Sequence, residues 1–119
     1  MEVWPMNVAI PMTAGRFTGC IKDAERLVVY RVNLETKQVC TINIVRTNDP
    51  ECLSCADLLR KYNVDQMILS RTHCNDCLDN YSSDYKILTT ALSGYPEQII
   101  TRYMYNPELF IDLADTVPA

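Results

Sequence analysis

Apolar and polar residues alternate along the first half of the chain in a pattern typical of β-strands. An apolar stretch over residues 7–12 predicts a first strand, which Pro11 and then Gly15 bring to an end. Two runs rich in β-branched residues, 27–32 and 39–45, flank a polar turn at residues 35–37. These two runs predict an antiparallel hairpin.

After Pro50 the pattern changes to alternating helices and strands. Ser54 and Asp57 resemble a capping box that opens a helix ending near Asn63. Short apolar runs at residues 66–70 and 86–89 predict two further strands. The other predicted elements are a weaker helix over residues 75–81, a helix that begins at Pro96, and one or two helical turns in the tail from residue 106.

This order of elements predicts an α/β fold. A strand and a hairpin followed by alternating helices and strands favour a mixed sheet of about five strands with three helices, antiparallel at one side and parallel at the other. The chain has 119 residues, which suits a single domain, and it contains no repeat, linker or low-complexity segment.

Composition and charge exclude several classes of function. The net charge of −4 and the scattered basic residues argue against a nucleic-acid partner. No apolar run approaches the ~18 residues of a membrane span, and no secretory signal pattern opens the chain. Neither a phosphate-binding glycine loop nor a nucleophile elbow is present. We therefore expect a cytoplasmic protein that is not an enzyme.

The six cysteines are the unusual feature of this composition. Four of them form two Cys-x-x-Cys pairs, Cys52 with Cys55 and Cys74 with Cys77, and 18 residues (56–73) separate the pairs. This spacing matches that of four-thiolate metal sites. Soft thiolates select zinc, copper(I) or iron–sulfur clusters, so the four cysteines are the candidate metal ligands.

Two further residues are candidate cofactor contacts. His73 precedes the second pair directly, and Cys20 lies in a loop after the first predicted strand, which could reach the same sheet edge. Cys40 falls within a predicted strand and is expected to be a small core residue.

The paired cysteines are also compatible with three roles that involve no cluster. A structural zinc ion would fit the spacing, and a Cys-x-x-Cys pair at a helix start is the geometry of dithiol–disulfide oxidoreductases. In the third role the cysteines are simply buried side chains that fill the core.

A family resemblance rests on residues 7–11 and 24–32, on residues 55–59 with 62–68, and on residues 86–88 and 93–103. In these segments the chain resembles the dinitrogenase iron–molybdenum cofactor (NifX/NafY-like) family. The resemblance covers roughly residues 6–105, with residues 1–5 as an N-terminal extension and 106–119 as a C-terminal tail. The resemblance implies a small ribonuclease-H-like domain that carries a metal–sulfur cofactor or its precursor.

Two departures from the family pattern affect the predicted site. Cys20 stands where the family usually has a histidine, and residues 71–77, which include His73, replace a glycine-rich turn. Both departures add candidate ligands. We therefore expect a non-catalytic binding or carrier protein for an iron–sulfur or mixed metal–sulfur cluster, with zinc as the alternative metal. Its expected partners are the cluster and a cluster donor or acceptor protein, and an oligomer is compatible with the sequence.

Overall fold

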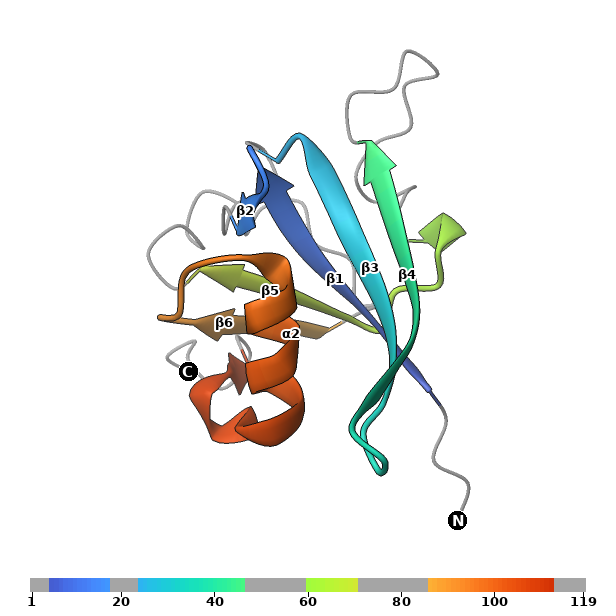
Figure 1. The fold of residues 1–119 in the computed structure, drawn as a ribbon, viewed down its shortest axis with the longest axis vertical. Coiled ribbons are helices and arrows are strands. Elements are labelled where there is room, and N and C mark those ends of the chain that lie inside the picture. The colour runs from blue at the N-terminus through green and yellow to red at the C-terminus, as the bar shows by residue number, and fades with distance from the viewer. Residues whose placement is uncertain (1–4, 18–23, 47–59, 71–85, 113–119) are drawn as a thin grey trace, which may run out of the picture.

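A computed structural model of the chain describes residues 5–17, 24–46, 60–70 and 86–112. The strands are β1 (Met6–Thr13), β2 (Arg16–Phe17), β3 (Arg26–Asn33), β4 (Gln38–Arg46), β5 (Gln66–Ser70), β6 (Lys86–Thr90) and β7 (Ile111–Asp112). An α-helix, α2 (Pro96–Tyr105), and a 3-10 helix, η3 (Pro107–Leu109), lie between β6 and β7. Figure 1 shows these elements as one twisted sheet with α2 packed against it.

The seven strands form one mixed sheet in the order β4-β3-β1-β5-β6-β7, with β2 paired to β1. Strand β1 pairs antiparallel with β3 and parallel with β5. Strands β3 and β4 form the predicted hairpin, and β5 and β6 are parallel. The predicted ranges of these five strands agree with the observed ones.

The predicted fold class, a ribonuclease-H-like domain with about five strands and three helices, is wrong. The sheet has seven strands, and α2 is the one α-helix whose bounds the described residues contain. The two strands that were not predicted, β2 and β7, have two residues each, too few to show an alternating pattern. Of the predicted helices over residues 54–62 and 75–81, only residues 60–62 are described; Arg60 and Lys61 are helical, and Tyr62 is in a turn.

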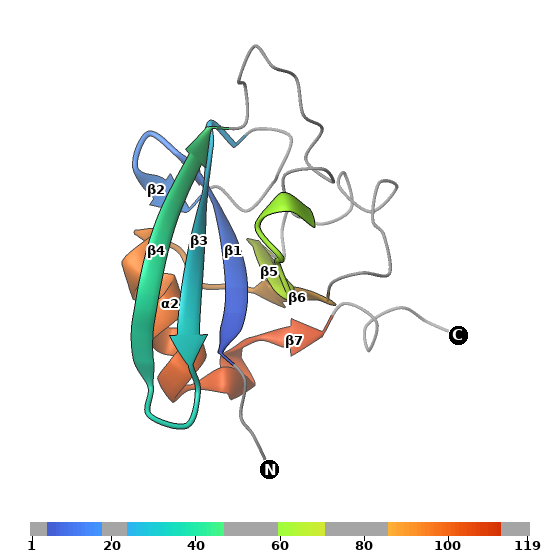
Figure 2. The same ribbon diagram turned by 90° about the vertical axis from the view of Figure 1, so that its right-hand side faces the viewer.

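Strand β1 is the centre of the core because it is buried on both faces. Val8, Ala9 and Ile10 are fully buried, as expected for a strand with a continuous apolar run. Ala9 belongs to one cluster with side chains of β3, β5 and β6. Val8 and Ile10 belong to the cluster beneath α2, which also includes Phe110 after η3. Figure 2 shows α2 on one face of the sheet and the segment before β5 on the other.

Pro11 lies within β1, although proline lacks a backbone N–H and is normally confined to edge strands. Backbone groups alternate sides along a strand, and the Asp65 N–H donates to the Asn7 carbonyl at 2.9 Å, so Asn7, Ala9 and Pro11 face β5. The pairing of β1 with β5 is limited to Val8 and Ala9. Pro11 therefore lies beyond the end of this ladder, where no N–H is needed.

The turn after β1 explains the two-residue strand β2. Ala14 and Gly15 have φ angles of 53° and 81°, the left-handed conformation of a two-residue hairpin turn. Thr13 then pairs with Arg16, and the Phe17 N–H donates to the Gly94 carbonyl at 2.8 Å. Gly15 therefore reverses the chain instead of simply ending the strand.

Helix α2 begins as the sequence predicts. Pro96 occupies its first turn, and the Gln98 side chain accepts a hydrogen bond from the Tyr95 N–H at 2.9 Å. Ile99, Ile100 and Tyr103 are buried against the sheet. Within the described residues, no helix combines the length and apolar character that crossing a bilayer requires.

We predict that Ile68→Ala lowers the free energy of unfolding by about 2–4 kcal/mol, because it leaves a cavity under α2. The matched variant Ile42→Ala, on an exposed side chain of β4, should change it by no more than about 0.5 kcal/mol. Urea unfolding in dilute solution, followed by circular dichroism, measures both. Equal losses would contradict the assignment of Ile68 to the core.

Candidate functional site

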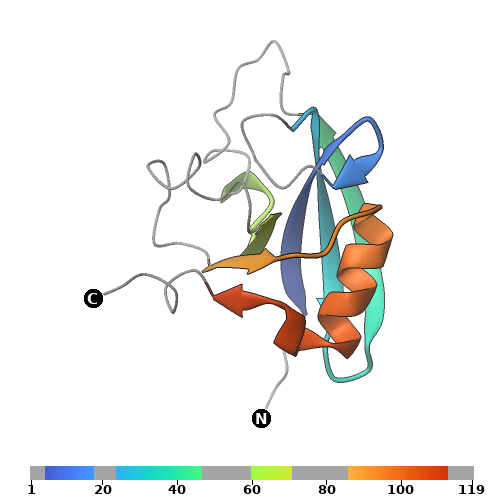
Figure 3. The ribbon, with the colours of Figure 1, turned by 90° about the vertical axis from the view of Figure 1, so that its left-hand side faces the viewer.

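The carboxyl ends of four strands meet at one edge of the sheet. Strand β4 is antiparallel to β3, which is antiparallel to β1, so β4 runs in the same direction as β1, β5 and β6. The register places Arg26 opposite both Met12 and Arg46, and Ser70 opposite Thr90. We call this the carboxyl edge, defined by Met12, Arg46, Ser70 and Thr90. Figure 3 shows the sheet from the side on which β6 and α2 lie.

Each segment that carries a predicted site residue adjoins this edge. Residues 18–23 follow β2, which is paired to the end of β1, residues 47–59 follow Arg46, and residues 71–85 follow Ser70. The predicted site residues lie in these three segments, outside the described residues: Cys20, Cys52, Cys55, His73, Cys74 and Cys77.

The order of the strands marks one position on the carboxyl edge. From β1 the chain continues to β3 and β4 on one side, and it then returns to form β5 and β6 on the other side. The connections therefore change direction between β1 and β5. In open α/β sheets, ligands bind outside the carboxyl ends of the strands at such a switch point.

Two arginines at the carboxyl edge were not identified from the sequence. Arg26 and Arg46 are directly opposite each other on adjacent strands, and both are exposed. Cross-strand pairs of like charge are unfavourable. The two opposed arginines also create a positive potential that favours an anionic ligand. Only the register of β3 and β4 reveals that the two arginines are neighbours, because 19 residues (27–45) separate them along the chain.

Cys40 is exposed, so its prediction as a core residue is wrong. Thr41 pairs with Arg31 and Val39 with Val32, which leaves Cys40 as the extra residue of a β-bulge. Its thiol is free and lies on the outermost strand of the sheet.

The described part of the chain contains no group of three or more His, Cys, Asp or Glu side chains that could hold a metal ion. A surface depression of about 490 Å³ lies on the outer face of α2, lined by Glu97, Gln98, Thr101, Arg102, Tyr105 and Asn106. It contains no soft ligand, so it is unsuited to a metal–sulfur centre.

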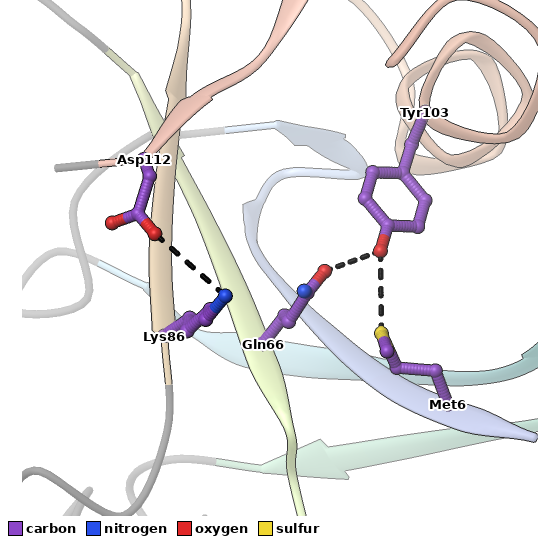
Figure 4. A network of polar contacts seen from close by, with 5 residues as sticks. All are labelled: Met6, Gln66, Lys86, Tyr103 and Asp112. Carbon is purple, nitrogen blue, oxygen red and sulfur yellow. Dashed lines mark hydrogen bonds and ion pairs between the residues drawn. The ribbon is translucent and has the colours of Figure 1, made fainter. Parts of the chain in front are cut away.

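A hydrogen-bonded network holds the opposite edge of the sheet together (Figure 4). The Tyr103 hydroxyl donates to the side-chain oxygen of Gln66, and the sulfur of Met6 lies 3.4 Å from the same hydroxyl. Met6 and Gln66 begin β1 and β5, and Tyr103 comes from α2. The network thus joins three elements at the amino ends of the strands.

Nearby, an ion pair of 4.0 Å joins Lys86, the first residue of β6, to Asp112, the last residue of β7. The side chain of Lys86 is largely exposed, so this ion pair contributes little stability.

Burial, with a smaller contribution from the negative charge of Asp65, raises the pKa of Tyr103 to about 12. The phenol therefore stays protonated and keeps its donor role over the whole physiological range. Burial also raises the pKa of Tyr30, with a contribution from Glu97 on α2.

Several solved structures share this fold. A protein of Methanocaldococcus jannaschii described as a "putative dinitrogenase" (MJ0327) has a TM-score of 0.67 at 15% identity, over 96% of this chain and 98% of that one. Its NMR structure gives a TM-score of 0.64 at 17% identity, over 97% of both chains. The protein PH0822 has a TM-score of 0.58 at 15% identity, over 84% of this chain and 91% of that one.

No family model matches the sequence, and no curated protein is similar to it. At such low identities the structural likeness establishes a shared fold, which supports the predicted resemblance at the level of the fold.

We predict that the free energy of unfolding falls as the pH rises from about 10 to about 12. The folded state holds the Tyr103 proton more tightly than the unfolded state, whose pKa is near 10, so this stabilisation is complete below pH 10 and is lost above it. The Tyr103→Phe variant should lack this contribution to the decrease in unfolding free energy, because it has no phenol to ionise. Titration of ¹³Cζ-labelled tyrosine by NMR measures the pKa directly, and ionisation of Tyr103 at about pH 10 would contradict the assignment.

Proposed function

We propose that this protein binds and carries an iron–sulfur or mixed metal–sulfur cluster, or its precursor, without catalysing a reaction. The ligands are the thiolates of Cys52, Cys55, Cys74 and Cys77, with Cys20 and His73 as additional contacts. The observation that carries the proposal is the direction of β4. It makes the strand before the first cysteine pair end at the same edge as the strand before the second.

The lengths of the connecting segments are compatible with a common site. Three strand steps lie between Arg46 and Ser70, which sets a lower bound of about 14 Å, because the ladder between β1 and β5 ends at Ala9 and does not reach the carboxyl ends. Cys52 follows Arg46 by six residues and Cys74 follows Ser70 by four, which allows extended reaches of about 20 Å and about 14 Å. Cys20 follows Phe17 by three residues, a reach of about 10 Å. No strand has to unpair for these residues to meet.

The donor set and the electrostatics fit such a cargo. Thiolates are the ligands that iron–sulfur and copper–sulfur centres select, and a cluster held by four thiolates is anionic in its common oxidation states. Arg26 and Arg46 supply positive charge at the edge from which the first pair departs. Thiolate ligands also require a reducing compartment, so the proposal includes a cytoplasmic location.

The structural likeness adds limited support. The M. jannaschii protein is described as a "putative dinitrogenase", which agrees with the family that this sequence resembles. The likeness is one of fold, so the ligands proposed for this chain rest on its own cysteines.

Anaerobically purified, untagged protein should contain iron and acid-labile sulfide and absorb near ~400 nm. The double variant Cys55→Ser/Cys77→Ser should lose most of the metal and the colour, because each pair then retains a single thiolate. Cys40→Ser is the matched control. It removes an exposed thiol from β4, outside the proposed ligand set, and should leave the metal content unchanged.

Different results would point to the alternative functions. One zinc ion per chain without sulfide, whose chelation unfolds the protein, would indicate a structural site. Metal-free protein whose thiols close reversibly and reduce small disulfides would indicate a dithiol oxidoreductase. Equal metal loss in the double variant and in Cys40→Ser would reject the proposed ligand set.

A further inference from the structure

Strand β4 exposes apolar side chains where its neighbour buries them. Ile42 and Ile44 are opposite Tyr30 and Val28 of β3, and opposed residues of an antiparallel pair point to the same face. Val28 and Tyr30 are 3% and 5% exposed beneath α2, whereas Ile44 and Ile42 are 60% and 56% exposed. Val39 is also exposed.

The cause is the extent of the helical layer. The cluster beneath α2 takes side chains from β1, β3, β5 and β6 but none from β4. On the other side of β4, Thr41 and Asn43 are polar. The strand therefore has an apolar side facing the same way as the core beneath α2, and α2 does not cover it (Figure 1).

The two outermost strands of the sheet, β7 and β4, differ in how they are protected against pairing with another chain. At one edge, β7 has two residues, and Asp112 forms an ion pair with Lys86. At the other edge, β4 has nine residues, with neither charge nor proline before Arg46. Edge strands usually avoid pairing by being short, charged, bulged or interrupted by proline. Only the bulge at Cys40 serves this purpose in β4, and it leaves Thr41–Arg46 regular.

We propose that β4 pairs antiparallel with β4 of a second copy of this chain, so that two sheets join into one across a two-fold axis at Asn43. Such a contact is self-complementary, as a two-fold interface requires. Ile42 of each copy is then opposite Ile44 of the other, and Thr41 is opposite Val45. Arg46 is opposite Cys40, so no two like charges meet across the seam.

A second copy suits this strand better than an unrelated peptide for two reasons. The exposed pair of β-branched residues finds an identical pair at the matching register, and such cross-strand pairs are favourable. The regular part of the strand carries no charge before Arg46 that would select a partner of opposite sign. The regular seam is only about 20 Å long. A single strand pair of this length buries little surface, whereas stable interfaces bury about 1,200 Å² or more. We therefore expect a weak dimer, with a Kd of about 100 µM.

Sedimentation velocity from 10 µM to 1 mM tests the proposal, with a thiol reductant and a chelator present to exclude disulfide-linked and metal-bridged dimers. The wild type should show a reversible monomer–dimer equilibrium. Ile44→Lys should raise the Kd at least tenfold, because it buries an unpaired charge in the seam. Tyr95→Lys is the matched control, since it also replaces an exposed apolar side chain, at the start of α2, and it should leave the Kd unchanged.

A mixed sample of ¹³C-methyl-labelled and unlabelled chains tests the register. Intermolecular NOEs between Ile42 and Ile44 should appear at high concentration and vanish in Ile44→Lys. A monomer throughout the range, a dimer that Ile44→Lys leaves intact, or an equal effect of Tyr95→Lys would each overturn the proposal. Ile44 lies outside the proposed ligand set, and the experiment is done with a chelator present, so failure here leaves the proposed cluster binding untouched.

Discussion

The structure depends on the burial of β1 on both faces. Val8, Ala9 and Ile10 have no exposed surface, so each of their neighbours must supply apolar contacts. Strand β3 pairs antiparallel with β1 on one side, and β5 pairs parallel with β1 on the other. Helix α2 covers one face of this central group, and Tyr103 ties it to the amino ends of β1 and β5. The other strands extend the sheet outward from β1, and their burial falls at β4, where the helical layer ends.

The elements that could be predicted from the sequence are those whose periodicity extends over five residues or more. The alternation in residues 39–45, the apolar run at 66–70 and Pro96 at a helix start all correspond to observed elements. Strands β2 and β7 could not be predicted, because two residues define no period and their pairing depends on a turn and on β6. The exposure of Cys40 was also beyond sequence reasoning, because a bulge and the limited width of the helical layer cause it.

The candidate site shows a similar division. Residue types and spacing identify the cysteine pairs as a unit, yet the sequence leaves open whether both pairs reach one edge. Two successive antiparallel steps, β1 to β3 and β3 to β4, restore the direction of the chain. The strand before Cys52 therefore ends at the same edge as β1 and β5, which surround the switch point, with β3 between it and β1. The opposed arginines Arg26 and Arg46 are a consequence of the same register, which no local pattern encodes.

Pro11 has a mechanical consequence for this arrangement. Because Pro11 has no N–H, it cannot extend the ladder between β1 and β5, which ends at Ala9. The last residues of the two strands are therefore not paired with each other. At the other end of the same strands, the Tyr103 hydroxyl contacts both Met6 of β1 and Gln66 of β5 and so links the two strands. The pair β1–β5 is therefore held together at its amino ends and unpaired at its carboxyl ends. The unpaired carboxyl ends lie at the switch point, where β1 and β5 can separate by local motion while the buried centre of the sheet stays intact.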